Sequence, residues 1–195
     1  MPYDILPSGI KRGIGKVVYV IRNPKDVFVS CKFFLQSFTP NVYNGDMDGF
    51  LKIFLSDELG GFGTGGSWST HTKEWDDGIT SNPNLQVHII KYEELKKDTY
   101  GEIEKLAKFL DVKYSKELLG NIVKEVAFDK MKAVHKTESG VTEKWTHICK
   151  DGRLPVYRKG IVGDWKNHLT VKQNELFDAV IEEKLSGRNI ELIYE

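Results

Sequence analysis

Residues 16–24 of the chain read KVVYVIRNP, and this stretch carries the main fold signal of the sequence. The β-branched and aromatic run from Lys16 to Arg22 is typical of a buried strand. Asn23 is a good N-cap and Pro24 suits the first position of a helix, so a helix should begin directly after the strand. The stretch therefore predicts a strand that is followed at once by a helix.

The predicted helix carries an apolar stripe at helical spacing, which we expect to face inward. The stripe consists of Val27, Ser30, Cys31, Phe34, Leu35 and Phe38. Ser30 contributes a hydroxyl to this stripe, and a buried hydroxyl requires a hydrogen-bond partner. That partner is either a carbonyl of the preceding helical turn or a ligand, and both interpretations stay open.

A second strand is predicted at residues 85–92, where apolar side chains alternate and then continue as a short run. Amphipathic helical patterns separate it from the first strand, and a helical crossover of this kind is typical of parallel strands in an α/β sheet. Arg22 and Tyr92 stand at the carboxyl ends of the two strands, the edge beyond which open α/β sheets bind ligands. Later helices are expected around residues 103–110 and 118–126 and after a capping box at 170–173.

Length and composition limit the class of protein. The 195 residues fit one domain spanning 1–195 with a sizeable core. The 28 basic residues balance the 28 acidic ones, which argues against a nucleic-acid-coating protein and requires any anion site to be local. No apolar run is long enough to cross a bilayer, and residues 1–4 lack the features of a signal peptide. Cys31 and Cys149 form neither a disulfide framework nor a metal-ligand pattern, so we expect reduced thiols, a cytoplasmic location and no metal.

A glycine cluster at residues 60–66 satisfies the string G-x-G-x-x-G. A dinucleotide-binding fingerprint must follow a strand, whereas this cluster follows a helical pattern, so a loop is the better interpretation. Beyond the cluster, Trp68, His71 and Trp75 recur at helical spacing. They belong either to the core or to a pocket for a flat apolar ligand.

Residues 158–167 read RKGIVGDWKN and combine the residue types that phosphate recognition needs. Arg158 offers a planar fork of donors, Lys159 a mobile point charge, and Gly160 lets backbone N–H groups approach the oxygens. A solvated basic loop is the alternative interpretation. Periodicity fades between residues 132 and 163, which predicts a long loop of the kind that is usually functional or disordered.

Together these pieces resemble the cytosolic sulfotransferases, from about Met1 to the C-terminus. The resemblance implies a single α/β domain, a central parallel sheet flanked by helices, with a fold related to that of the P-loop kinases. It also implies a transferase that moves a sulfuryl group from 3′-phosphoadenosine 5′-phosphosulfate (PAPS) to a hydroxyl or amine of a small molecule. PAPS is the co-substrate, and no metal is involved.

The resemblance assigns roles to particular residues. Residues 19–30 match the 3′-phosphate segment of the family, in which Arg22 and Ser30 hold the phosphate. Arg158, Lys159 and Gly160 match a second clamp on the same phosphate. The residues that match contacts to the adenosine are Tyr92, Phe128 and Met131.

Two further segments match family features outside the nucleotide site. Trp68 and His71 match the region beside the acceptor pocket. A short dimerisation signature falls on Lys166, Thr170, Val171 and Glu175, which implies a homodimer through the Lys166–Glu175 segment.

The chain also departs from the family pattern. Val126 replaces a usual Thr, which removes a hydroxyl contact to the nucleotide worth about 1 kcal/mol, and Val156 and Tyr157 replace a Phe-Met pair. Full-length relatives begin with a phosphate loop and carry their catalytic His in a Lys-Thr-His-Leu-Pro segment, and residues 1–4 align with the segment directly after that His. We therefore expect an N-terminally truncated fragment whose general base lies upstream of Met1. Such a fragment should transfer sulfuryl groups poorly and be marginally stable or aggregation-prone on its own.

Two other functions compete with this one. A non-catalytic nucleotide-binding or dimerising module would bind 3′,5′-adenosine bisphosphate without turnover. A nucleotide kinase relative would need a GxxxxGK[ST] loop, and the sequence contains no such string. The acceptor itself stays open, because the aromatic residues near Trp68 and at Phe33-Phe34 suit a phenol, a sterol or a hydrophobic alcohol equally well.

Overall fold

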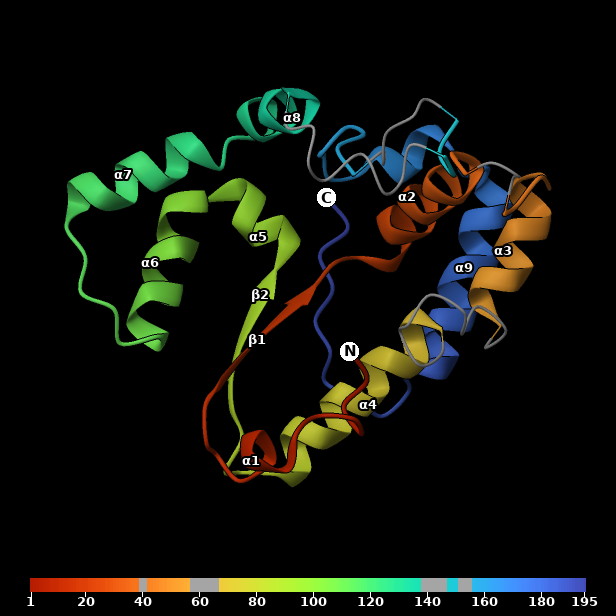
Figure 1. Ribbon diagram of the computed structural model, residues 1–195. Helices are drawn as coiled ribbons and strands as arrows, with labels where there is room; N and C mark the ends of the chain where they lie inside the picture. The colour runs from red at the N-terminus through yellow and green to blue at the C-terminus, as the bar shows by residue number, and fades with distance from the viewer. Residues whose placement is uncertain (39–41, 57–66, 138–146, 151–155) are drawn as a thin grey trace.

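Two parallel strands form the centre of the molecule, β1 (Lys16–Ile21) and β2 (Gln86–Lys91) (Figure 1). The computed structural model describes residues 1–38, 42–56, 67–137, 147–150 and 156–195. The register pairs Lys16 with Gln86 and Ile21 with Lys91, and in the described part the sheet has two strands. The predicted parallel pair with a helical crossover is confirmed, and with it the α/β fold class.

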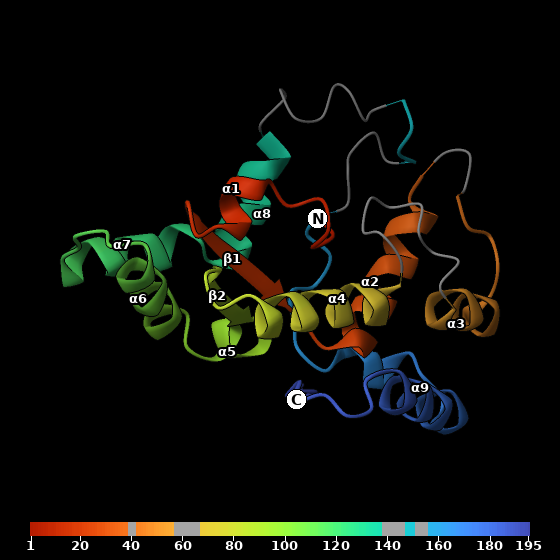
Figure 2. The same cartoon turned by 90° about the horizontal axis from the view of Figure 1, so that it is seen from below.

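Helices lie on both sides of this strand pair (Figures 1 and 2). They are α1 (Ser8–Lys11), α2 (Pro24–Gln36), α3 (Met47–Leu55), α4 (Trp68–Ser81), α5 (Tyr92–Lys97), α6 (Thr99–Phe109), α7 (Lys116–Glu125), α8 (Phe128–Thr137), the 3-10 helix η2 (Asp164–Asn167) and α9 (Val171–Lys184). Two sets matter below, the α2–α3–α9 group and the α5–α8 group, which lie on opposite sides of the strands. None of the helices in the described ranges is long and apolar enough to span a membrane.

The predicted helix starts are confirmed in atomic detail. The Asn23 side chain accepts a hydrogen bond of 2.8 Å from the backbone N–H of Asp26, which caps α2. Thr170 and Gln173 form the reciprocal capping box that opens α9. The expected loop between 132 and 163 is wrong at its start, because α8 continues to Thr137. The glycine cluster at 60–66 lies outside the described residues, as do residues 138–146 and 151–155 of the expected loop.

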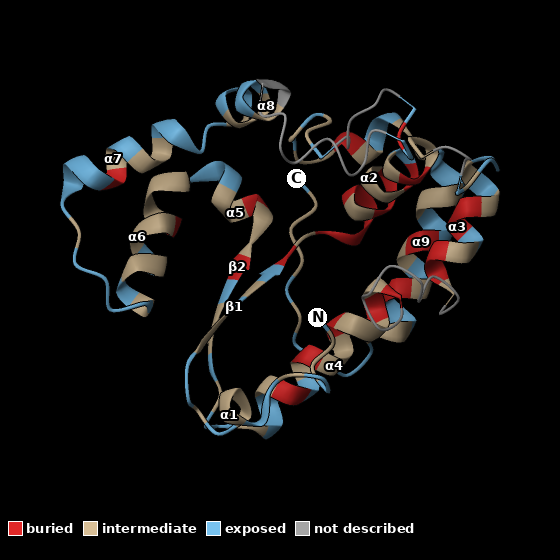
Figure 3. Ribbon diagram, viewed as in Figure 1, coloured by how far each residue is buried: buried red, intermediate tan, exposed pale blue. Residues whose placement is uncertain are grey.

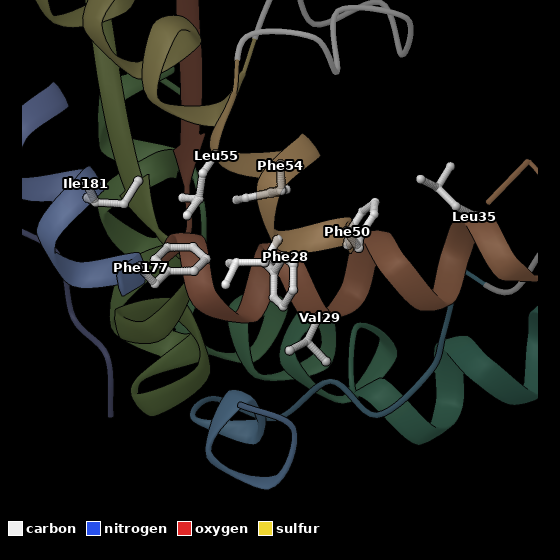
Figure 4. Packing of buried hydrophobic residues seen from close by; sticks show 9 residues of the cluster. Phe28, Val29, Leu35, Phe50, Phe54, Leu55, Phe177 and Ile181 are labelled. Atoms are coloured by element: carbon white, nitrogen blue, oxygen red, sulfur yellow. The ribbon is translucent and has the colours of Figure 1, made fainter. Parts of the chain in front are cut away.

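The main core lies between α2, α3 and α9 (Figure 4). Phe28 is fully buried, and its ring centroid lies 5.3 Å from that of Phe50 and 5.8 Å from that of Phe177. Figure 3 shows the buried residues concentrated on this side of the molecule and sparse in the α5–α8 group. The amphipathic patterns predicted between the two strands are confirmed at α3, which buries Phe50, Leu51, Phe54 and Leu55.

The inward stripe predicted for α2 needs a correction. Its core face carries Phe28 and Val29, both 0% exposed, which the predicted stripe omitted. Leu35 of the predicted stripe is buried in the core, and Cys31 packs against that core. Ser30 and Cys31 are both half-buried and also line a cavity beside the helix. The sequence pattern could not separate the two faces because α2 is apolar on both.

The strands are also less buried than their composition predicts. Ile21 and Ile90 are buried, but Val18, Val20 and Ile89 are 40%, 56% and 48% exposed. The buried strand expected at residues 16–22 is therefore wrong at Val18 and Val20. Parallel strands become continuously buried only where other elements cover both faces, and the described pair is covered in part.

Candidate anion-binding site

A cavity of about 520 Å³ lies at the carboxyl end of β1, against α2 and residues 156–158. Arg22, Ser30 and Arg158 all line it, although they come from segments far apart in the sequence. The rest of its wall is mostly apolar and consists of Val27, Cys31, Phe33, Phe34 and Val156. The structure thus brings together two guanidinium groups and a hydroxyl that the sequence predicted as one phosphate site.

Arg22 is fixed by three neighbours and keeps donor capacity. Its Nη2 donates to the Ile161 carbonyl at 3.1 Å and lies 3.3 Å from a carboxylate oxygen of Asp26. The guanidinium carbon sits 4.4 Å from the ring centroid of Tyr92, a cation–π arrangement. The buried Nε atom has no hydrogen-bond partner within the described ranges.

Arg158 has a parallel environment on the other side of the cavity. Its Nη2 donates to Asp164 at 2.8 Å, and its guanidinium carbon lies 4.8 Å from the ring centroid of Phe33. Its Nε is also buried and unpartnered among the residues that the structure describes. Both arginines are therefore held by a carboxylate and an aromatic ring, and the Nε of each has no partner among the described residues.

Asp164 organises the basic loop and was missed by the sequence analysis. It is buried and accepts hydrogen bonds from Arg158 and from Lys159, both at 2.8 Å. Asn167 Nδ2 donates to it at 3.1 Å, and His168 Nε2 lies 3.2 Å away. Burial alone would raise the pKa of Asp164, but the hydrogen bonds from Lys159, Arg158 and Asn167 outweigh burial and hold that pKa well below its usual range. Asp164 is therefore ionised at neutral pH and orients two cations.

Asp26 joins the two halves of the site and was also missed. Its carboxylate accepts the backbone N–H groups of Gly163 at 2.9 Å and Trp165 at 3.0 Å, besides its contact with Arg22. The neighbouring Asn23 donates to Glu93 at 3.0 Å and so ties the start of α2 to the start of α5. An acidic residue placed inside each basic motif was the signal that could have revealed Asp26 and Asp164.

The anion cavity adjoins a second, apolar cavity through contacts of Gly160 and Arg22. Gly160 has φ +67°, and a Cβ there would overlap the ring of Phe128. Tyr92, Phe128 and Met131 line a larger cavity of about 700 Å³ enclosed by α5–α8, together with Val126. The residues predicted to contact the adenosine thus share one apolar cavity, which touches the clamp at the Arg22–Tyr92 and Gly160–Phe128 contacts.

The other predicted residues lie elsewhere. Trp68 packs against the main core, and His71 lies 6.0 Å from Tyr19 and 6.4 Å from Trp75 between ring centroids. Neither residue lines the anion cavity, and their acceptor role stays a prediction. The residues of the predicted dimer segment, Lys166, Thr170, Val171 and Glu175, are all exposed.

The two cysteines are free thiols and differ in position. Cys31 lines the anion cavity, and burial raises its pKa to about 11, so it is protonated at neutral pH. Cys149 is buried beside Phe38. No group of three or more His, Cys, Asp and Glu residues that could hold a metal ion occurs within the described ranges.

Comparison with known proteins places the chain among homologous sequences along nearly its whole length. A family model described as "Sulfotransferase domain" matches residues 1–189. Sulfotransferase 1B1 of Mus musculus is 37% identical over 191 residues, covering 98% of this chain and 61% of that protein. Sulfotransferase 1E1 of Bos taurus is 34% identical over 190 residues, covering 97% of this chain and 61% of that protein. This chain therefore spans about three fifths of the length of these curated relatives.

A solved structure has the same arrangement of elements. The crystal structure of mouse sulfotransferase SULT7A1 complexed with PAP superposes with a TM-score of 0.78 at 29% sequence identity. The superposition covers 95% of this chain and 64% of that one.

Proposed function

We propose, because this chain belongs to the sulfotransferase family, that it contributes to the transfer of a sulfuryl group from PAPS to a hydroxyl or amine of a small molecule. The observation that carries this proposal is the convergence of Arg22, Ser30 and Arg158 on one cavity. Two guanidinium forks and a hydroxyl suit an anion with several oxygens. We assign the 3′-phosphate of the nucleotide to this cavity.

The environment of the two arginines that line the cavity supports this assignment. Arg22 Nε and Arg158 Nε are buried without partners in the described part of the chain, and buried polar groups normally have one. Asp26 and Asp164 hold the two guanidinium groups in place without occupying every N–H. The volume of about 520 Å³ is typical of a small-molecule site. Lys159 and Gly160 belong to the same clamp, Lys159 as a cation and Gly160 as the backbone that approaches the ligand.

The apolar cavity suits the base of the same nucleotide. Tyr92, Phe128 and Met131 line it, and flat purines bind well between aromatic and apolar side chains. Its contacts with the clamp at Tyr92 and Phe128 would hold base and phosphate at neighbouring positions. Bound PAPS supplies the sulfuryl group. The residues of this chain bind and orient it, and orientation lowers the barrier to transfer.

The proposal also includes a wall for the acceptor molecule, a homodimer surface and a cellular location. Trp68 and His71 on α4 are our candidates for the acceptor wall, and the acceptor is a small molecule with a hydroxyl or amine. The exposed Lys166, Thr170, Val171 and Glu175 are the proposed homodimer surface. A cytoplasmic location agrees with two free thiols.

The alternative is a non-catalytic nucleotide-binding or dimerising module. Such a module would hold the same anion between Arg22, Ser30 and Arg158 and would release it unchanged.

Calorimetry tests the proposal. The chain is titrated with 3′,5′-adenosine bisphosphate and with ATP, and the bisphosphate should bind at least about tenfold more tightly, since only it carries the 3′-phosphate. A preference for ATP would end the assignment. A second assay offers PAPS and a phenol. Turnover supports the transferase, and binding without turnover supports the non-catalytic module.

A further inference from the structure

Residues 188–195, which we call the strap, follow α9 and run past the strand pair toward η2 (Figure 1). Near its start, Arg188 pairs with Asp76 and Asp77 on α4. Further along, Glu191 pairs with Lys91 at the end of β2, and Leu192 packs against the main core. The strap is therefore anchored to three different parts of the fold before it reaches η2.

The last residues of the strap hold Trp165. The Tyr194 carbonyl accepts a hydrogen bond of 3.2 Å from the indole Nε1 of Trp165. Glu195 pairs with Lys166, the next residue of η2. The strap thus contacts η2 through both a backbone carbonyl and a side-chain carboxylate.

Tyr194 and Trp165 also enclose a buried cation. The ammonium nitrogen of Lys25 lies 4.7 Å from the ring centroid of Tyr194 and 4.4 Å from that of Trp165. It donates to Asn174 at 2.7 Å and pairs with Asp178 at 2.5 Å. Lys25 is only 4% exposed, so it depends on these partners in place of water. Loss of the Tyr194 ring would open one side of this cage.

Residues 163–165, the turn at the start of η2, also fix the position of the clamp cations. The backbone N–H of Trp165 donates to Asp26, and so does that of Gly163. Between them lies Asp164, which holds Arg158 and Lys159. Trp165 is therefore held by α2 through its backbone and by the strap through its side chain. A shift of this turn would move the carboxylate that orients both clamp cations.

We propose that the strap positions the Arg158–Lys159–Gly160 clamp through Tyr194 and Lys25, so that the clamp is preorganised for an anionic phosphate. This inference rests on the proposed function. Tyr194 and Lys25 are positioning residues, and neither lines the anion cavity. Preorganisation raises affinity because the loop is already ordered before the ligand arrives.

Amide hydrogen exchange tests the inference without any ligand. In Tyr194→Ala, exchange at the N–H groups of Gly163 and Trp165 should be about tenfold faster, because those hydrogen bonds open more often. Tyr194→Phe retains the ring and the carbonyl and should stay within about twofold of the wild type. Tyr100→Ala is the matched control, a tyrosine on α6 that lines neither the anion cavity nor the apolar cavity. Unchanged exchange in Tyr194→Ala, or equal acceleration in Tyr194→Phe, overturns the inference.

Binding of 3′,5′-adenosine bisphosphate is the second readout, measured by calorimetry at a temperature where circular dichroism shows each variant folded. Tyr194→Ala should raise the Kd about tenfold and Tyr194→Phe less than about twofold. Should Tyr194→Ala fail to fold, Trp165→Phe replaces the indole by a smaller ring without the Nε1 donor and should raise the Kd about threefold. If exchange is faster in Tyr194→Ala but the wild type binds no bisphosphate, the proposed function is refuted. The contact between the strap and residues 163–165 would still be supported. A wild-type Kd in the fastest-exchanging variant overturns the role of the strap in binding.

Discussion

The α2–α3–α9 group is tightly packed, whereas the α5–α8 group is loosely packed. The first contains Phe28 and Phe177, both 0% exposed, and the second contains Leu119 as the buried hydrophobic side chain of its described helices. An apolar cavity of about 700 Å³ lies within the second group. The charged clamp is built on the rigid group through α2, and the apolar half of the candidate site lies on the loose one. Fixed geometry benefits charge recognition, while a loose apolar wall can repack around a flat ligand.

Removing the centre of the tight group should have the largest effect. Phe28→Ala is expected to lower the free energy of unfolding by about 4 kcal/mol, because the cavity cannot close within a packed aromatic cluster. Phe109→Ala in α6 removes the same side chain from a half-buried position against His88 and Lys16, and it should cost only ~1–2 kcal/mol. Chemical denaturation followed by circular dichroism measures both. Equal losses would mean that the two groups do not differ in packing.

Removing either arginine of the anion cavity should have the next largest effect, a loss of binding affinity. Arg158→Ala and Arg22→Ala should each weaken 3′,5′-adenosine bisphosphate binding by roughly 2–4 kcal/mol, because each leaves phosphate charge without a partner. Arg12→Ala, an exposed arginine just after α1, is the matched control and should bind like the wild type. If calorimetry finds no change in either clamp variant, the assignment of the phosphate is wrong.

Neutralising the carboxylate beneath the clamp should have a smaller effect on stability. Asp164→Asn should lower the free energy of unfolding by about 2 kcal/mol, since Arg158 and Lys159 lose their charged partner. Most of this loss comes from Arg158, because the Lys159 side chain is 43% exposed and well solvated. Asp111→Asn, at a carboxylate 84% exposed, should change stability by less than about 0.5 kcal/mol. Similar values for the two variants would remove Asp164 from the support of the clamp.

The smallest expected effect is a change in how the free energy of unfolding depends on pH. Folding depresses the pKa of Asp164 below its ordinary value of 3.8, so the folded state binds its proton less readily than the unfolded state. The stability that Asp164 contributes is therefore complete above about pH 4 and is lost as pH falls toward the folded pKa. Denaturation measured from about pH 5 down to about pH 2 should give a shallower decline for Asp164→Asn than for the wild type. Parallel curves would contradict the depressed pKa.

Patterns between near neighbours in the sequence predicted the local structure well. The strand-to-helix unit at residues 16–24, the cap at Asn23 and the capping box at Thr170 all appear as expected. Residue types singled out Arg158, Lys159 and Gly160, and the resemblance assigned Arg22 and Ser30 to the same phosphate. The structure brings Arg22, Ser30 and Arg158 to one cavity, and their contact with phosphate stays a prediction. Asp26 and Asp164 were missed because their partners include backbone N–H groups and cations whose positions depend on the folded chain.

The amino-acid order alone was enough for the α/β class, the helix starts and the types of residue at the candidate site, because these depend on spacing and on contacts a few residues apart. Folding was needed to show which face of α2 enters the core, how the strap reaches Trp165, and that two carboxylates hold the two arginines. Such contacts join residues distant in sequence, and a helix with two apolar faces carries no local mark of which neighbour each will meet.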